Sequence, residues 1–150
     1  ANVGRGLIRG MHWHAHYRAA DGWRWRATLN LTRGRNSEGQ PLSHIPPAFG
    51  LVAASRSGEW LTFDAHLRWS GWKRVEDYGS GATDNLAEAT PEGTPAWWTL
   101  GFDVDLRLTE RTTFSCGIHN LLDRHYKVFA SGISAPGRDM RVGLRWRPAA

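Results

Sequence analysis

Three histidines near the N-terminus alternate with apolar residues. His12, His14 and His16 are separated by single residues, so on an extended strand their rings share one face. Imidazoles two positions apart can share Zn²⁺, Cu²⁺ or a haem iron. Successive rings on a strand face lie about 6 to 7 Å apart, which makes one ion bound by all three awkward. We interpret them as candidate ligand-binding residues on a polar face, with metal coordination as the less favoured alternative.

Carboxylates form two further candidate groups. Asp103 and Asp105 share one strand face with Arg107, which is compatible with an acid/base pair or a Ca²⁺ ligand set. A ladder of salt bridges to arginines of neighbouring strands is the favoured interpretation. The second group lies in a polar loop without regular Ca²⁺ ligand spacing, and we interpret it as solvated loop: Asp84, Glu88 and Glu92.

Other chemistry finds little support in the sequence. There is no Gly-x-Ser-x-Gly or comparable nucleophile arrangement and no phosphate-binding glycine loop. The single cysteine, Cys116, falls in a strand pattern and is expected to be a packed, inert thiol. The net charge is +5, but the arginines are dispersed along the chain, which argues against a nucleic-acid partner. We expect a protein that is not an enzyme, with no cofactor and no metal.

The elements that must position these residues are strands. Seven stretches alternate apolar and polar residues with period two, the pattern of a strand with one apolar face. Their approximate ranges are 7–18, 23–32, 45–53, 61–69, 98–108, 111–119 and 138–147. No apolar run approaches the roughly 20 residues that a membrane-spanning helix needs. Any membrane role must therefore use strands.

The connections between these strands alternate between tight and long. Asp21-Gly22 and Ser57-Gly58 mark tight turns, whereas the stretch 74–95 is a long polar loop. Outer-membrane barrels have short periplasmic turns and longer extracellular loops. The predicted fold is therefore all-β, an antiparallel up-and-down transmembrane β-barrel segment. Transmembrane barrels begin at about eight strands, so seven strands indicate part of a larger barrel.

Aromatic residues support a bilayer around this sheet. The sequence has nine tryptophans, which favour membrane interfaces. On the predicted lipid face, four aromatic residues lie near tight turns: Tyr17, Trp23, Trp25 and Trp146. Trp69 and Trp98 lie near the long loops. Two aromatic girdles around an aliphatic band are typical of outer-membrane barrels, so outer-membrane lipid is an expected partner.

One ordered set of residues suggests a family. Asn120-Leu121-Leu-Asp123-Arg-His-Tyr126, a loop, Pro136-Gly137-Arg138 and a closing alternating strand resemble the C-terminus of TonB-dependent outer-membrane receptors. The resemblance implies a barrel of about 22 strands, of which residues 1–150 supply roughly the last third. The plug domain and the earlier strands would then lie outside this chain. It also implies that these landmark residues are structural rather than catalytic.

The resemblance carries expectations about function. Such receptors lie in the bacterial outer membrane and import a scarce ligand, often an iron chelate such as a ferric siderophore, haem or cobalamin. Import is energised by the inner-membrane TonB complex. Nothing in the sequence matches the plug or the segment that contacts TonB, so TonB is expected to act through the N-terminal part of the parent protein.

Two other classes of protein remain open from the sequence. One is a smaller outer-membrane barrel, either a passive pore or an enzyme with its catalytic set at the extracellular rim. The other is a soluble β-sandwich or lipocalin-like binding module, with tryptophans lining a ligand site. The soluble module predicts that the apolar faces of 61–69 and 98–108 meet in one core.

Overall fold

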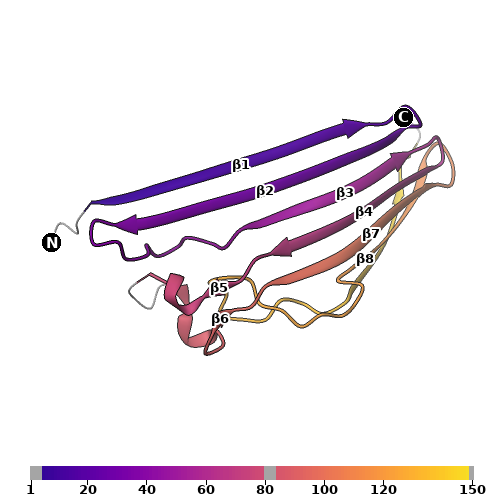
Figure 1. The fold of residues 1–150 in the computed structure, drawn as a ribbon. Coiled ribbons are helices and arrows are strands. Elements are labelled where there is room, and N and C mark those ends of the chain that lie inside the picture. Colours follow the sequence, from indigo (N-terminus) through magenta and orange to yellow (C-terminus); the bar gives the residue numbers. More distant parts are fainter. Residues whose placement is uncertain (1–4, 80–83, 149–150) are drawn as a thin grey trace.

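The computed structural model of the chain describes residues 5–79 and 84–148. Its main feature is a seven-stranded antiparallel sheet with the order β1-β2-β3-β4-β7-β8-β9 (Figure 1). The strands are β1 (Gly6–Arg18), β2 (Trp23–Asn36), β3 (Phe49–Ser57), β4 (Leu61–Ser70), β7 (Trp97–Arg107), β8 (Thr112–His119) and β9 (Asp139–Trp146). The predicted all-β, up-and-down fold and the number of long strands are thus confirmed.

The connections sort to opposite ends of the sheet. Residues 19–22, 58–60 and 108–111 form the tight-turn end, and the described residues of 37–48, 71–79, 84–96 and 120–138 form the long-loop end (Figure 1). The long connection between β4 and β7 has short elements of its own: β5 (Lys73–Arg74), η1 (Val75–Asp77), η3 (Leu86–Glu88) and β6 (Gly93–Thr94). Strands β5 and β6 pair with each other as a small second sheet, which period-two alternation did not predict.

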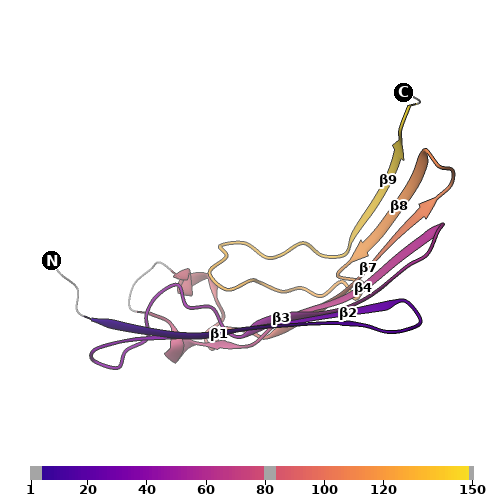
Figure 2. The same cartoon turned by 90° about the horizontal axis from the view of Figure 1, so that it is seen from above.

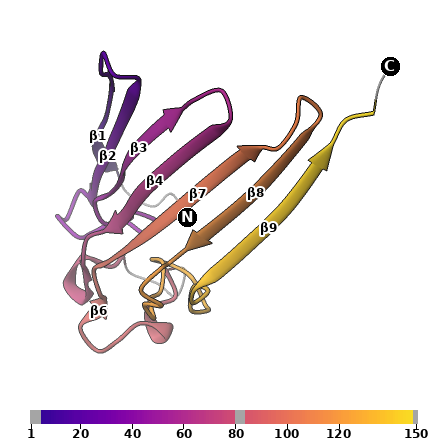
Figure 3. The ribbon, with the colours of Figure 1, turned by 90° about the vertical axis from the view of Figure 1, so that its right-hand side faces the viewer.

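The main sheet is curved and open. It bends progressively from β1 to β9 (Figure 2). Strands β1 and β9 are its two edges (Figure 3). Among the described residues no helix is long and apolar enough to span a membrane.

Strand register collects the apolar side chains on one face. Met11 pairs with Leu31 between β1 and β2, Leu67 pairs with Leu100 between β4 and β7, and Cys116 pairs with Val142 between β8 and β9. Side chains directly opposite each other in a ladder point to the same side of the sheet. The apolar residues therefore form one continuous surface, which we call the apolar face, and the other side is the polar face.

Side chains on the apolar face are half-buried on the central strands and exposed at the edge. Met140, Val142 and Leu144 of β9 are 68%, 74% and 69% exposed. The buried hydrophobic residues of the described chain are few, namely Ile45, Ala53 and Tyr78. Strands β4 and β7 are hydrogen-bonded neighbours within one sheet, so their apolar faces lie side by side rather than facing each other. The soluble sandwich is therefore the wrong architecture for this chain.

Two strands differ from the sequence-based expectation. Strand β3 begins at Phe49 rather than at Ile45, and Leu51 and Ala53 pair with Thr28 and Arg26 on the polar face. Gly50, Val52, Ala54 and Arg56 occupy the apolar face instead, which explains the weak alternation of this stretch. Strand β2 continues to Asn36 because Gly6–Ile8 of β1 pair with its last residues.

The two faces can be told apart by adjacent substitutions in one strand. Ala27 lies on the apolar face between Ala15 and Val52, and Thr28 lies on the polar face between His14 and Leu51. We predict that Ala27→Arg lowers the free energy of unfolding in lipid by about 1 to 3 kcal/mol, because the cost of a cation falls from about 2 to 4 kcal/mol at the bilayer midplane towards the interface beside Trp25. Thr28→Arg is the matched control and should change it by less than about 1 kcal/mol.

The measurement is denaturant unfolding of the intact protein that contains this chain, reconstituted in lipid vesicles and followed by tryptophan fluorescence. An equal or larger cost for Thr28→Arg would contradict the assignment of the two faces.

Candidate functional site

The polar face carries the three N-terminal histidines side by side. Successive ring centroids of His12, His14 and His16 are 5.9 and 5.8 Å apart, and all three side chains are exposed. His12 Nδ1 shares a hydrogen bond of 2.6 Å with Asn30 Oδ1 on the neighbouring strand. The rings form a row along one strand and do not converge. Ligand binding by these histidines stays a prediction.

A second polar cluster crosses four strands of the sheet. Arg26 Nη2 donates to Asp64 Oδ2 at 3.0 Å, and His66 Nδ1 lies 3.3 Å from Asp64 Oδ1. His66 Nδ1 is also 3.7 Å from Asp103 Oδ2. On the next strand, His119 Nε2 lies 3.1 Å from Asp103 Oδ1. The rings of His66 and His119 meet edge to face, with centroids 5.3 Å apart.

Two glycines give this cluster its space. Gly101 lies directly across from His66, and Gly117 lies directly across from Asp103. A Cβ atom on Gly101 would overlap the imidazole of His66, and one on Gly117 would overlap the carboxylate of Asp103. The imidazole and the carboxylate therefore lie against bare backbone, a position that any larger residue would exclude.

The cluster corrects one prediction from the sequence. Asp103 contacts two histidines, and Asp105 accepts a hydrogen bond from the Ser115 hydroxyl. The predicted salt bridges between these two carboxylates and arginines of neighbouring strands are not found among the described residues, so that prediction was wrong. Sequence reasoning missed His66 and His119 because alternation gives the face of a residue, whereas register decides which residues of that face meet.

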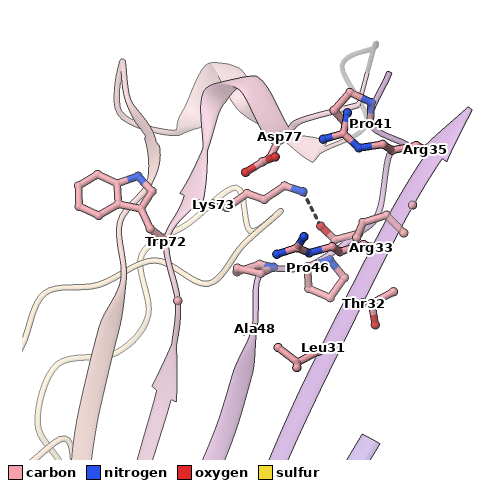
Figure 4. A pocket seen from close by; sticks show the side chains of 14 residues that line it. Leu31, Thr32, Arg33, Arg35, Pro41, Pro46, Ala48, Trp72, Lys73 and Asp77 are labelled. Carbon is pink, nitrogen blue, oxygen red and sulfur yellow. Dashed lines mark hydrogen bonds between the residues drawn. The ribbon is translucent and has the colours of Figure 1, made fainter. Parts of the chain in front are cut away.

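A cavity of about 390 Å³ opens among the segments at the long-loop end. Its lining includes residues 31–35 near the end of β2, the Ile45–Ala48 segment and the start of β5 (Figure 4). Arg33, Arg35 and Lys73 line it together with a single carboxylate, that of Asp77. The lining is therefore predominantly cationic.

Lys73 is the most buried charged residue of this cavity. Its side chain is buried, and Nζ donates a hydrogen bond to the Ile45 carbonyl at 2.7 Å, drawn as a dashed line in Figure 4. Nζ lies 5.1 Å from the ring centroid of Phe129 and 5.8 Å from that of Tyr78. Burial lowers the pKa of Lys73, and the negative charges of Asp77 and Asp84 oppose that change only in part.

The loop carboxylates do not converge on one point. Asp84 is fully buried, and its Oδ1 accepts the backbone N–H of His44 at 2.8 Å. Glu88 lies beside Lys127, whose Nζ donates to the Glu88 carbonyl at 2.7 Å. Glu92 accepts hydrogen bonds through its backbone carbonyl from Trp72 and Val75. These contacts join loop segments to one another.

The landmark residues join the end of β8 to the start of β9. Asn120 is buried, with its Oδ1 accepting the N–H of Arg124 at 2.9 Å and its Nδ2 donating to the carbonyls of Arg124 and Pro136. Asp123 Oδ1 accepts the N–H of Arg138 at 2.7 Å. We call this arrangement the β8–β9 clasp.

Backbone geometry explains the residue types in the clasp. Asn120 and Asp123 have φ angles of 49° and 51°, a left-handed conformation that Asn and Asp tolerate better than most residues. A Cβ on Gly137 would lie 2.6 Å from Asp123 Oδ1. Arg138 Nε also donates to the Leu121 carbonyl, at 2.9 Å. Tyr126 packs on Trp97 with a centroid separation of 4.3 Å.

The aromatic residues predicted to form girdles lie on the apolar face. Tyr17 pairs with Trp25 beside the first tight turn, and Trp69 pairs with Trp98 towards the long loops. Trp146 pairs with Thr112 at the tight-turn end. The remaining member, Trp23, packs on Phe63 of the same face with centroids 6.3 Å apart. Contact of these residues with lipid stays a prediction.

Comparisons with known proteins show which fold this sheet resembles. An antiparallel up-and-down sheet with one apolar face and one polar face has the pattern of a transmembrane β-barrel wall. No protein-family model and no curated sequence matches the chain. Several solved structures do match the chain in fold. The copper transporter OprC is 16% identical over 94% of this chain and 24% of its own, with a TM-score of 0.77.

Two siderophore receptors give similar values. The ferric yersiniabactin uptake receptor FyuA from Yersinia pestis is 18% identical over 97% of this chain and 24% of its own, with a TM-score of 0.72. A mutant of the ferric enterobactin receptor PfeA from Pseudomonas aeruginosa is 19% identical over 94% of this chain and 22% of its own, with a TM-score of 0.73.

The chain spans about a quarter of the length of these proteins. It therefore has the fold of a segment of the β-barrel of TonB-dependent outer-membrane receptors.

The clasp predicts a stability effect for Asn120. We expect Asn120→Ala to lower the free energy of unfolding by about 2 kcal/mol or more, because three partly buried hydrogen bonds to the backbone are lost and alanine is strained at this φ angle. Leu122→Ala is the matched control, since Leu122 is exposed in the same turn. Unfolding in denaturant measures both variants, and equal stabilities would show that the clasp is not needed.

The lowered pKa of Lys73 predicts a pH dependence. Between that pKa and 10.5, the ordinary value, the unfolded state binds more protons than the folded state, so stability rises with pH. We expect the wild type to gain unfolding free energy relative to Lys73→Met as pH rises towards 10.5. Lys127→Met, which removes the only other lysine, is the control. Parallel profiles for wild type and Lys73→Met would contradict this assignment.

Proposed function

We propose that this chain is the C-terminal part of the barrel of a TonB-dependent receptor in the bacterial outer membrane, which imports a scarce ligand. The observation that carries the proposal is the sheet itself. Its register keeps one face apolar across seven strands, and 94% or more of the chain superposes on barrels of uptake proteins. The landmark residues in the β8–β9 clasp agree with the sequence resemblance to the same class.

The charge of the loop cavity favours an anionic ligand. Arg33, Arg35 and Lys73 outnumber Asp77 on its lining, and burial of Lys73 strengthens its field in the cavity. A ferric siderophore or another negatively charged chelate fits this chemistry. The titles of the similar structures name copper, ferric yersiniabactin and ferric enterobactin for those proteins.

In this proposal the other parts of the chain have supporting roles. The girdle residues lie at the two membrane interfaces, and the apolar face contacts lipid. The clasp holds the last two strands in register at the long-loop end. The contacts with TonB belong to the N-terminal part of the parent receptor. The protein moves its ligand without chemical change, so it is a transporter and not an enzyme.

Uptake by living cells tests the proposal. In the parent bacterium, deletion of the gene should abolish accumulation of one radiolabelled ligand among ferric siderophores, haem and cobalamin. Restoring the gene should restore accumulation only in cells with an active TonB complex. Uptake that persists without the gene for every ligand, or that needs the gene but not TonB, would overturn the proposal. The second result would favour a passive pore.

A further inference from the structure

We propose that His66, Asp103 and His119 bind a divalent transition-metal cation on the polar face of the barrel wall. The three residues come from the adjacent strands β4, β7 and β8. One ligand atom from each lies within 4.8 Å of the other two. Among the described residues, this is the set of His, Cys, Asp and Glu side chains that converges in this way.

The donor atoms define the class of ion. Two imidazole nitrogens and one carboxylate oxygen suit zinc and its first-row neighbours, at about 2.0 to 2.2 Å from the ion. Neighbouring ligands of a tetrahedral ion are roughly 3.3 Å apart at these bond lengths. Asp103 Oδ1 and His119 Nε2, 3.1 Å apart, already have this spacing. His66 Nδ1 lies 3.7 Å from the other carboxylate oxygen, Asp103 Oδ2, and the three residues together offer one ligand atom each within 4.8 Å of one another.

The site is built into the sheet. Gly101 and Gly117 leave room for the His66 ring and the Asp103 carboxylate against the backbone of the neighbouring strand. The His66 side chain is 14% exposed and that of His119 is 32% exposed, so two of the three ligands are held by their surroundings. A ring fixed by packing loses little freedom when it binds an ion.

Local charge also favours a cation. Asp64 and Asp103 lie directly opposite each other in the β4–β7 ladder, where like charges repel. Arg26 pairs with Asp64, while the ion pairs that Asp103 makes among the described residues are with histidines alone. A single N–H on His66 Nδ1 cannot satisfy both carboxylates. A bound dication would neutralise Asp103 and reduce the repulsion between Asp103 and Asp64, whose Oδ1 lies 3.3 Å from His66 Nδ1.

The row of His12, His14 and His16 makes a useful contrast. Its rings are exposed and belong to one strand, and their centroids are 5.9 and 5.8 Å apart, close to the two-residue repeat of a strand. The proposed site instead joins three strands, so the ion would also cross-link the barrel wall. This inference concerns a resident ion and does not depend on which ligand the receptor imports.

Metal binding by the intact protein tests the site. The protein is purified in detergent, stripped with a chelator and titrated with Zn²⁺ by calorimetry. We expect one equivalent to bind, with affinity at least tenfold weaker in His66→Gln, Asp103→Asn and His119→Gln. His14→Gln and Asp105→Asn are matched controls on the same face and should bind as the wild type does. Heat-modifiable migration in gels confirms that each variant is folded.

A second measurement needs no variant. Co²⁺ bound by three protein ligands in a four-coordinate site gives strong visible absorption bands, whereas hydrated Co²⁺ is octahedral and absorbs weakly. We expect one equivalent of Co²⁺ to produce the strong bands and Zn²⁺ to remove them. The absence of these bands, wild-type affinity in His119→Gln, or loss of binding in His14→Gln would overturn the proposal. All readouts are independent of uptake, so they fail or succeed separately from the proposed transport function.

Discussion

The structure depends on the register between its antiparallel strands. Side chains of a strand alternate between the two faces, so a slip of one residue would move every apolar side chain of that strand to the opposite face. The observed register aligns Met11 with Leu31, Leu67 with Leu100 and Cys116 with Val142. A largely apolar face results, with Arg56 at its tight-turn end and Arg9 and Arg33 at its long-loop end, and with it a surface that suits hydrocarbon rather than water.

The same register decides what happens on the polar face. Arg26, Asp64, His66, Asp103 and His119 come into contact because four strands bring them to neighbouring positions. Charged groups of this kind are costly when they lack partners in a partly buried setting. Glycines across the ladder make the close approach possible, since a side chain there would occupy the same space. Packing and electrostatics therefore select the same arrangement.

At the long-loop end, hydrogen bonds from side chains to the backbone take the place of the backbone hydrogen bonds between strands. Asn120 and Asp123 bind backbone groups on both sides of the connection between β8 and β9. Lys73 binds the Ile45 carbonyl beneath aromatic rings and so ties the β5 segment to the connection that leads into β3. Buried polar groups need such partners, because water cannot reach them. The loops are thereby held over the end of the sheet.

Much of this fold could be predicted from the sequence. Strands with strict alternation, such as 61–69 and 98–108, were located to within a residue or two, and their faces were assigned correctly. Strand β3 was placed less well, because Leu51 and Ala53 are apolar residues on the polar face. The clasp residues were found as an ordered motif, although their hydrogen bonds were not foreseen.

The sequence by itself determined the class of fold and the two faces of the sheet, because period-two alternation is a local property of each strand. The tertiary structure alone decided which polar residues meet. His66 and Asp103 are 37 positions apart in the chain, and their contact follows from the pairing of Asp64 with Asp103. Register between distant strands arises from the whole sheet and its turns. No single stretch of sequence contains it.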